Sequence, residues 1–168
     1  MSRLKLALIG LGRMGRVHAQ ALAKSKNIEV VAIADPSSQS IEFAENTFKD
    51  AATFADYRQA MQHAGVEACL IASPTPLHAE MVQHALSAKL HVLCEKPLAL
   101  DVEVAKKLAD DAASKKLVLQ IGHWRRFSPP WLAAFCRSGW RWLSPSRCRS
   151  ASSAALACTA SSSTAPSA

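Results

Sequence analysis

The chain has 168 residues, of which 49% are hydrophobic, and it carries a formal net charge of +7. This length suits one domain with a sizeable core. The charge is uneven: residues 1–111 hold all 13 acidic residues and 12 of the 20 Lys and Arg residues, while residues 112–168 hold 8 basic residues and no acidic one. The positive excess therefore belongs to the C-terminal third, and nucleic acid is not an expected partner.

No uncharged apolar run approaches the roughly 18 residues that a membrane span needs, and the basic, apolar start lacks a clean cleavage site. We therefore expect a cytoplasmic protein. The five cysteines form no C-x-x-C pair, so neither a metal site nor a disulfide framework is expected. Cys69 and Cys94 lie within apolar runs and are expected to be buried, reduced thiols.

Strand and helix signals alternate from the start. The apolar run LKLALIG (4–10) predicts a buried strand, and residues 13–25 predict a helix with Met14, Val17, Ala21 and Leu22 on its core face. Further strands are expected at 28–34, 52–54, 66–72, 90–95 and 116–122, with helices at 37–48, 56–64, 76–88 and 101–115. Strands that alternate with helices through short connections predict an α/β Rossmann fold, a doubly wound parallel sheet with helices on both faces.

The segment GLGRMG places Gly10, Gly12 and Gly15 in the G-x-G-x-x-G spacing, between the first strand and the first helix. In this position the first glycine allows a tight turn, the second a close approach of a pyrophosphate, and the third close packing of helix on strand. The backbone of this turn, which also contains Leu11, Arg13 and Met14, is therefore the expected phosphate-binding site.

Asp35 follows the second strand, 20 residues after Gly15. A carboxylate there accepts hydrogen bonds from the ribose hydroxyls of an adenosine and repels a 2′-phosphate. NAD is therefore the expected cofactor, with NADP second, because Arg13 offers a positive charge to a phosphate.

Two later segments, ASPTPLHAEMVQHAL (72–86) and HVLCEKPLAL (91–100), resemble the Gfo/Idh/MocA oxidoreductases. The segments GLGRMGRVHA (10–19) and QIGHWRRFSP (120–129) are most similar to the inositol 2-dehydrogenase branch, and the resemblance covers residues 4 to 131. It implies an NAD-dependent dehydrogenase that transfers hydride from a polyol or sugar hydroxyl. It also implies a homo-oligomer in the family.

The resemblance also assigns site residues. It places Lys96 beside the nicotinamide and the reacting hydroxyl, where an amine holds the hydroxyl or relays its proton. Glu95 and Pro97 flank it. Ser73, Pro74, Thr75 and His78 fall at the cofactor crevice, and Arg125 and Trp124 fall near the substrate. The plainer interpretations are that His78 and His18 are structural hydrogen-bonding or packing residues, and that Arg125 and Arg126 form a solvated basic pair.

We expect three parts: a dinucleotide-binding domain at 1–122, a linker toward a second domain at 123–143, and a disordered tail at 144–168. Of the 25 tail residues, 16 are Ser or Ala. Members of the family continue into a second domain with a largely antiparallel sheet, which supplies substrate residues and the oligomer interface. Because acidic residues and periodicity are lost together, we expect a frameshift near residues 130–136 and a truncated, weakly active or inactive chain. The alternatives are a non-catalytic NAD-binding module and a basic tail that binds a partner.

Overall fold

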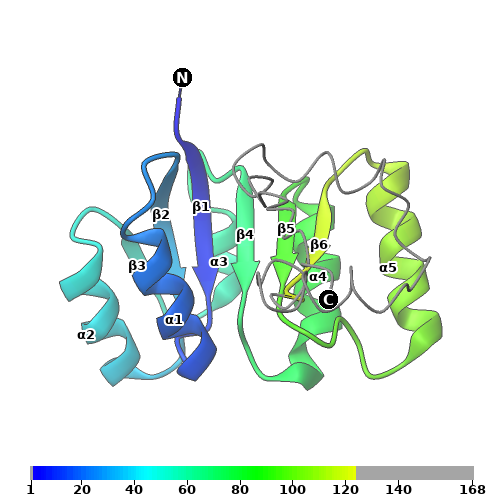
Figure 1. Ribbon diagram of the computed structural model, residues 1–168, viewed down its shortest axis with the longest axis horizontal. Helices are drawn as coiled ribbons and strands as arrows, with labels where there is room; N and C mark the ends of the chain where they lie inside the picture. The colour runs from blue at the N-terminus through cyan, green and yellow to red at the C-terminus, as the bar shows by residue number, and fades with distance from the viewer. Residues whose placement is uncertain (1, 124–168) are drawn as a thin grey trace, which may run out of the picture. The chain divides into compact units, whose positions relative to one another are not determined.

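A computed structural model of the chain describes residues 2–123, which form one α/β unit. Six parallel strands make one sheet in the order β3-β2-β1-β4-β5-β6 (Figure 1). The strands are β1 (Leu4–Ile9), β2 (Ile28–Ala34), β3 (Ala52–Phe54), β4 (Ala68–Ile71), β5 (His91–Cys94) and β6 (Leu119–Ile121). The helices are α1 (Arg13–Leu22), α2 (Ser38–Thr47), α3 (Tyr57–Met61), a 3₁₀ turn at Thr75–Leu77, α4 (His78–Ser87) and α5 (Val102–Ser114). This strand order confirms the predicted Rossmann fold.

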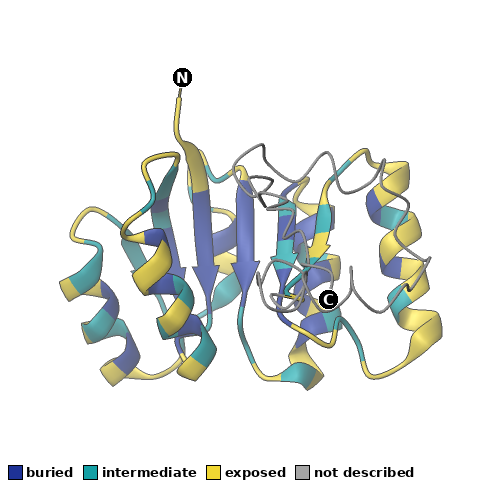
Figure 2. Cartoon of the chain, viewed as in Figure 1, coloured by how far each residue is buried: buried dark blue, intermediate teal, exposed yellow. Residues whose placement is uncertain are grey.

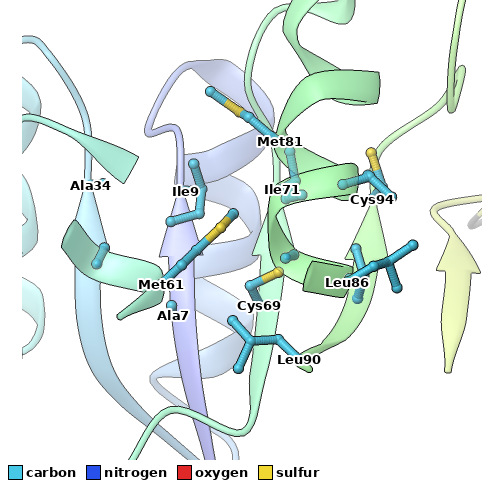
Figure 3. Packing of buried hydrophobic residues seen from close by; sticks show 14 of the residues in the cluster. Ala7, Ile9, Ala34, Met61, Cys69, Ile71, Met81, Leu86, Leu90 and Cys94 are labelled. Atoms are coloured by element: carbon cyan, nitrogen blue, oxygen red, sulfur yellow. The ribbon is translucent and has the colours of Figure 1, made fainter. Parts of the chain in front are cut away.

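The two faces of the sheet carry separate cores, because successive side chains of a strand point to opposite faces. In β1, Ala7 and Ile9 pack with residues of α3, α4 and α5, whereas Leu6 and Leu8 pack with residues of α1 and α2. Figure 2 shows the central strands buried under helices whose outer sides are exposed, and Figure 3 shows the first core around Ile9, Met61 and Ile71. The apolar strand runs in the sequence follow from this burial on both faces.

The core face of α1 differs from the prediction. The buried residues are Gly15, Ala19 and Leu22, while Val17 is 53% exposed and Ala21 is also exposed. Leu22 is buried as predicted, but Gly15 and Ala19 take the places expected for Val17 and Ala21, because α1 packs close to β1 at Gly15.

Side-chain caps begin three helices. The Ser37 hydroxyl accepts from the Ser40 amide, and the carboxylates of Asp56 and Asp101 accept from amides at the first turns of α3 and α5. The helix predicted at 37–48 is thus confirmed, with Ser37 as its cap.

The helices α1 and α3 end three residues earlier than predicted, at Leu22 and Met61, because the chain continues into turns. After α5, Lys116 adopts a positive φ of 57° and the Leu117 amide returns to the Ala112 carbonyl, so β6 begins only at Leu119. Lys89 does the same after α4, with φ 60°. Both turns are helix-ending motifs that usually carry glycine.

Within the described residues, no helix is long and apolar enough to cross a membrane. Cys69 and Cys94 are free and buried, as predicted. Burial in the core raises the pKa of the Cys69 thiol, and burial together with the charge of Glu95 raises the pKa of Cys94 to about 12. The predictions for the linker and tail, including the frameshift, lie outside the described residues and stay predictions.

Candidate functional site: the carboxyl edge of the sheet

The turn between β1 and α1 has the geometry that its three glycines predict. Gly10 has φ +86°, and a Cβ atom there would lie 2.9 Å from backbone atoms of Ala72 and Ser73. A Cβ atom at Gly15 would overlap the Gly10 carbonyl. At Gly12 a Cβ atom would meet nothing within 4 Å. The first and third glycines are thus required by the chain's own packing, whereas the second leaves open space at the start of α1.

Asp35 fastens this turn to the end of β2. Its Oδ2 accepts a hydrogen bond from the Leu11 amide at 2.6 Å, and its Oδ1 accepts one from the Ser37 amide at 2.9 Å. The Gly10 amide also donates to the Ala34 carbonyl. The carboxylate therefore lies beside the glycine turn, and each of its oxygens keeps a further acceptor position.

The loop after β4 contributes Ser73, Pro74 and Thr75 to the same edge. The Ser73 hydroxyl is buried and has no hydrogen-bond partner among the described residues. Buried hydroxyls in proteins usually have one, so this oxygen is suited to a ligand or a water.

His78 begins α4 and is 1% exposed. Its Nδ1 lies 2.7 Å from the Pro97 carbonyl oxygen and its Nε2 lies 2.9 Å from the Ser73 carbonyl oxygen. In either tautomer the ring donates to one of these carbonyls. It therefore joins the loop after β4 to the loop after β5, as the structural interpretation of His78 predicts.

Glu95, Lys96 and Pro97 follow β5 directly, and the peptide bond between Lys96 and Pro97 is cis. Glu95 is 8% exposed, whereas Lys96 and Pro97 are exposed. The Glu95 carboxylate contacts the His18 ring and the Lys96 amide. The lysine thus leaves the sheet on a loop whose first residue is firmly held.

A cavity of about 900 Å³ runs along this edge. Most of the predicted cofactor residues line it: Gly10, Gly12, Arg13, Met14, Asp35, Ser73, Pro74, Thr75, His78, Glu95 and Lys96. The structure therefore brings together residues that are up to 86 positions apart in the sequence, from Gly10 to Lys96. Three others, Leu11, Gly15 and Pro97, do not line it. Leu11 is 1% exposed and packs in the core.

One group of cavity residues was missed by the sequence analysis. Tyr57 and Arg58 of α3 both donate to Glu80 Oε1 on α4, at 2.7 and 2.6 Å, and the Arg58 guanidinium lies 4.6 Å from the centre of the Tyr57 ring. Burial and the Glu80 carboxylate raise the pKa of Tyr57 to about 12. No motif announces this group, since it is assembled from two helices.

The predicted substrate residues Trp124 and Arg125 lie outside the described residues. Among residues 2–123, no group of three His, Cys, Asp or Glu side chains is arranged to hold a metal ion.

The domain that contains this strand order, glycine turn and acidic residue matches a known protein family. A family described as "Oxidoreductase family, NAD-binding Rossmann fold" matches residues 4–123. The chain belongs to this family. The predicted family is thereby confirmed.

Relatives support the same placement. The chain is 43% identical over 130 residues to the rhizopine catabolism protein MocA of Rhizobium meliloti, which covers 77% of this chain and 40% of that protein. It is 37% identical over 133 residues to an inositol 2-dehydrogenase of an Arthrobacter strain, covering 77% of this chain and 39% of that protein.

Solved structures show the same fold. A scyllo-inositol dehydrogenase from Lactobacillus casei, with bound NAD(H) and scyllo-inositol, has a TM-score of 0.75 at 29% identity and covers 82% of this chain and 42% of its own. A 3-ketoreductase from Actinomadura kijaniata in complex with NADP has a TM-score of 0.74 at 26% identity, covering 82% of this chain and 43% of its own. The family thus binds either dinucleotide, and this chain spans about 40% of the length of these relatives.

Proposed function

We propose that this chain binds NAD along the carboxyl edge of its sheet, with the pyrophosphate on the turn from Gly10 to Gly15. The open space at Gly12 carries the proposal, because the other two glycines are required by the fold itself and this one is not. Amides at the start of α1 and the dipole of this helix face that space and favour a doubly charged pyrophosphate. The Ser73 hydroxyl, which has no partner among the described residues, offers a further hydrogen bond from the neighbouring loop after β4.

Asp35 is the proposed ribose ligand. Its two oxygens each use one acceptor position on a backbone amide and have another for a ribose hydroxyl. A 2′-phosphate beside this carboxylate would be repelled, which favours NAD over NADP. Arg13, which follows the second glycine, also lines the cavity and supplies a positive charge there.

When bound, NAD supplies the acceptor for a hydride. Lys96 is the proposed residue that holds the substrate hydroxyl and moves its proton, since it lines the cavity just beyond the end of β5. In the described part of the chain, no carboxylate lies within ion-pair distance of its ammonium group. His78 joins the loop after β5, which carries this lysine, to the loop after β4. In this proposal His78 has a structural role, and the lysine moves the proton.

We infer that the complete protein oxidises a hydroxyl of a polyol or sugar, because relatives that share this domain are inositol dehydrogenases. Lys96 is exposed in the described domain, and hydride transfer needs a site closed to water. The 168-residue chain assayed alone is therefore expected to bind NAD weakly and to turn over little or no polyol.

Titration of the purified chain with NADH, followed by nucleotide fluorescence, tests the proposal. We expect saturable binding in competition with ADP-ribose and weaker binding of NADPH. Asp35→Ser should narrow the difference between NADH and NADPH. Equal affinity for both nucleotides in the unmodified chain would contradict the role of Asp35, and absence of binding at millimolar NADH would contradict the proposal as a whole. Steady NADH formation from NAD and a polyol at ordinary enzyme rates would refute the expected lack of turnover.

A further inference from the structure

Glu95 is a buried carboxylate at a point where three parts of the fold meet. It follows β5, and its amide donates to the Ile71 carbonyl of β4. Its side chain contacts His18 of α1 on one oxygen and the Lys96 amide on the other. A buried charge is unfavourable unless it is paired and hydrogen-bonded, so the contacts with His18 and the Lys96 amide are needed to keep Glu95 in this position.

The contact with His18 is short and comes from the helix that begins at the glycine turn. The distance from Nε2 to Glu95 Oε1 is 2.7 Å, and the side chains are 25% and 10% exposed. Because an ionised carboxylate only accepts, the ring nitrogen donates. His18 lies on α1 between the core residues Gly15 and Leu22, so it moves with the helix that starts at Gly12.

Gly122, which follows β6, leaves room for the Glu95 carboxylate. A Cβ atom at Gly122 would lie 3.1 Å from Glu95 Oε1 and 3.2 Å from its Cδ. The Gly122 amide donates to the Cys94 carbonyl, which fixes the glycine beside the carboxylate. The glycine after β6 therefore leaves room for the Glu95 carboxylate beside its contact with His18.

We propose that His18 and Glu95 form a positioning pair that couples the phosphate-binding helix to the Lys96 loop. The chain of contacts runs from α1 through the His18 ring to Glu95 Oε1, and from Oε2 to the Lys96 backbone amide. The pair sets where the Lys96 loop lies relative to a pyrophosphate at the start of α1, without touching the cofactor's reacting atoms. The effect on nucleotide binding rests on the proposed function, whereas the effect on the loop does not.

The loop effect is measured first, in the full chain without nucleotide, by hydrogen exchange of the peptide that contains the Lys96 amide. His18→Leu removes the donor and is expected to raise deuterium uptake there at least about threefold in rate. His18→Gln is expected to restore protection, because its side-chain amide places a donor where Nε2 lies. His63→Leu is the matched control, since His63 does not line the cavity and contacts Phe54.

The coupling is measured next, by comparing NADH with ADP-ribose, which lacks the nicotinamide. His18→Leu removes the hydrogen bond to the charged Glu95 and so releases the Lys96 loop, for which we expect NADH affinity to fall about tenfold. ADP-ribose affinity should change less than about twofold, because ADP-ribose has no nicotinamide to lie beside that loop. The proposed pair would be contradicted if His18→Leu lowered the affinities for NADH and ADP-ribose equally or left deuterium uptake unchanged. It would also be contradicted if His18→Gln failed to restore either the protection from exchange or the NADH affinity. If His18→Leu does not fold, Glu95→Ala replaces it, because alanine offers no side-chain partner to either His18 or the Lys96 backbone amide. Absence of ADP-ribose binding in the unmodified chain would instead refute the proposed function and leave the exchange result to decide the loop effect.

Discussion

Gly12 and Gly15 should respond in opposite ways to the same substitution. A methyl group at Gly15 would overlap the Gly10 carbonyl oxygen and lie 2.8 Å from the Gly10 carbon, where ordinary contact begins at 3.4 Å. The obstacle is backbone, so α1 has to move away from β1 and open the contacts of Ala19 and Leu22. At Gly12 the added methyl meets nothing within 4 Å, and the backbone has φ −62° and ψ −167°, which any residue adopts.

The magnitudes follow from these contacts. Overpacking against a fixed group costs about 3 kcal/mol at the upper end of its usual range, and the better helix propensity of alanine returns about 1 kcal/mol. Gly15→Ala should therefore lose about 2 kcal/mol of unfolding free energy, or about 6–8 °C in melting temperature. Gly12→Ala loses at most about 1 kcal/mol as a helix cap and regains about 0.4–1 kcal/mol from the unfolded state. Its stability should stay near that of the unmodified chain.

Binding separates the two variants. With Gly12→Ala the methyl group occupies the space proposed for the pyrophosphate, so NADH affinity should fall at least about tenfold, or 1.4 kcal/mol. Unfolding is followed by far-ultraviolet circular dichroism, since all four tryptophans lie beyond residue 123, and binding by NADH fluorescence. A Gly15→Ala chain as stable as its parent would refute the packing argument. A stable Gly12→Ala chain with unchanged NADH affinity would refute the pyrophosphate placement.

Three further predictions concern the rest of the domain. Lys116→Gly should raise the unfolding free energy by a few tenths to about 1 kcal/mol in chemical denaturation, since Lys116 has φ 57° and glycine adopts this conformation without strain; a loss would contradict the assigned turn. Tyr57 is the single tyrosine and its pKa is raised to about 12, so the tyrosinate absorbance should rise about two pH units above the usual 10, with Glu80→Gln lowering that midpoint. Because a raised pKa stabilises the folded protein below pH 10, this contribution should be lost between pH 10 and 12, and a midpoint at 10 in the folded chain would disprove the contact. Cys69 and Cys94 should resist a maleimide at neutral pH until urea is added, as judged by peptide mass spectrometry, because burial raises both thiol pKa values; rapid native labelling of either would contradict their burial.

The fold was predictable because its signals are local and agree with one another. β1, β2 and β4 are short apolar runs, and the glycine turn stands between a strand and a helix, so the chain order of elements indicates the parallel sheet directly. The bounds were less predictable. Lys116 occupies a turn position that normally carries glycine, so nothing in the sequence marked that β6 begins only at Leu119 rather than at residue 116.

The site residues that belong to a sequence motif could be predicted, whereas the contacts formed between side chains of separate helices and loops could not. Gly12, Asp35 and Lys96 each follow a strand, and the carboxyl ends of parallel strands share one edge. The contacts of Tyr57 with Glu80 and of His18 with Glu95 join residues 23 and 77 positions apart, which no local pattern reports. The errors at Val17 and Ala21 of α1 have the same origin, because close packing against β1 buries the small residues Gly15 and Ala19 instead.

Backbone amide NMR of the full chain, recorded with and without NAD, tests the central claim most directly, because it reports both binding and its place. We expect the largest shifts at the glycine turn (10–15), at Asp35, at Ser73 and Thr75 and at residues 95–96, with Gly65, which does not line the cavity, unchanged. Saturation with NAD that leaves the glycine turn unshifted, or shifts centred on another surface, would contradict a dinucleotide site at the carboxyl edge of this sheet.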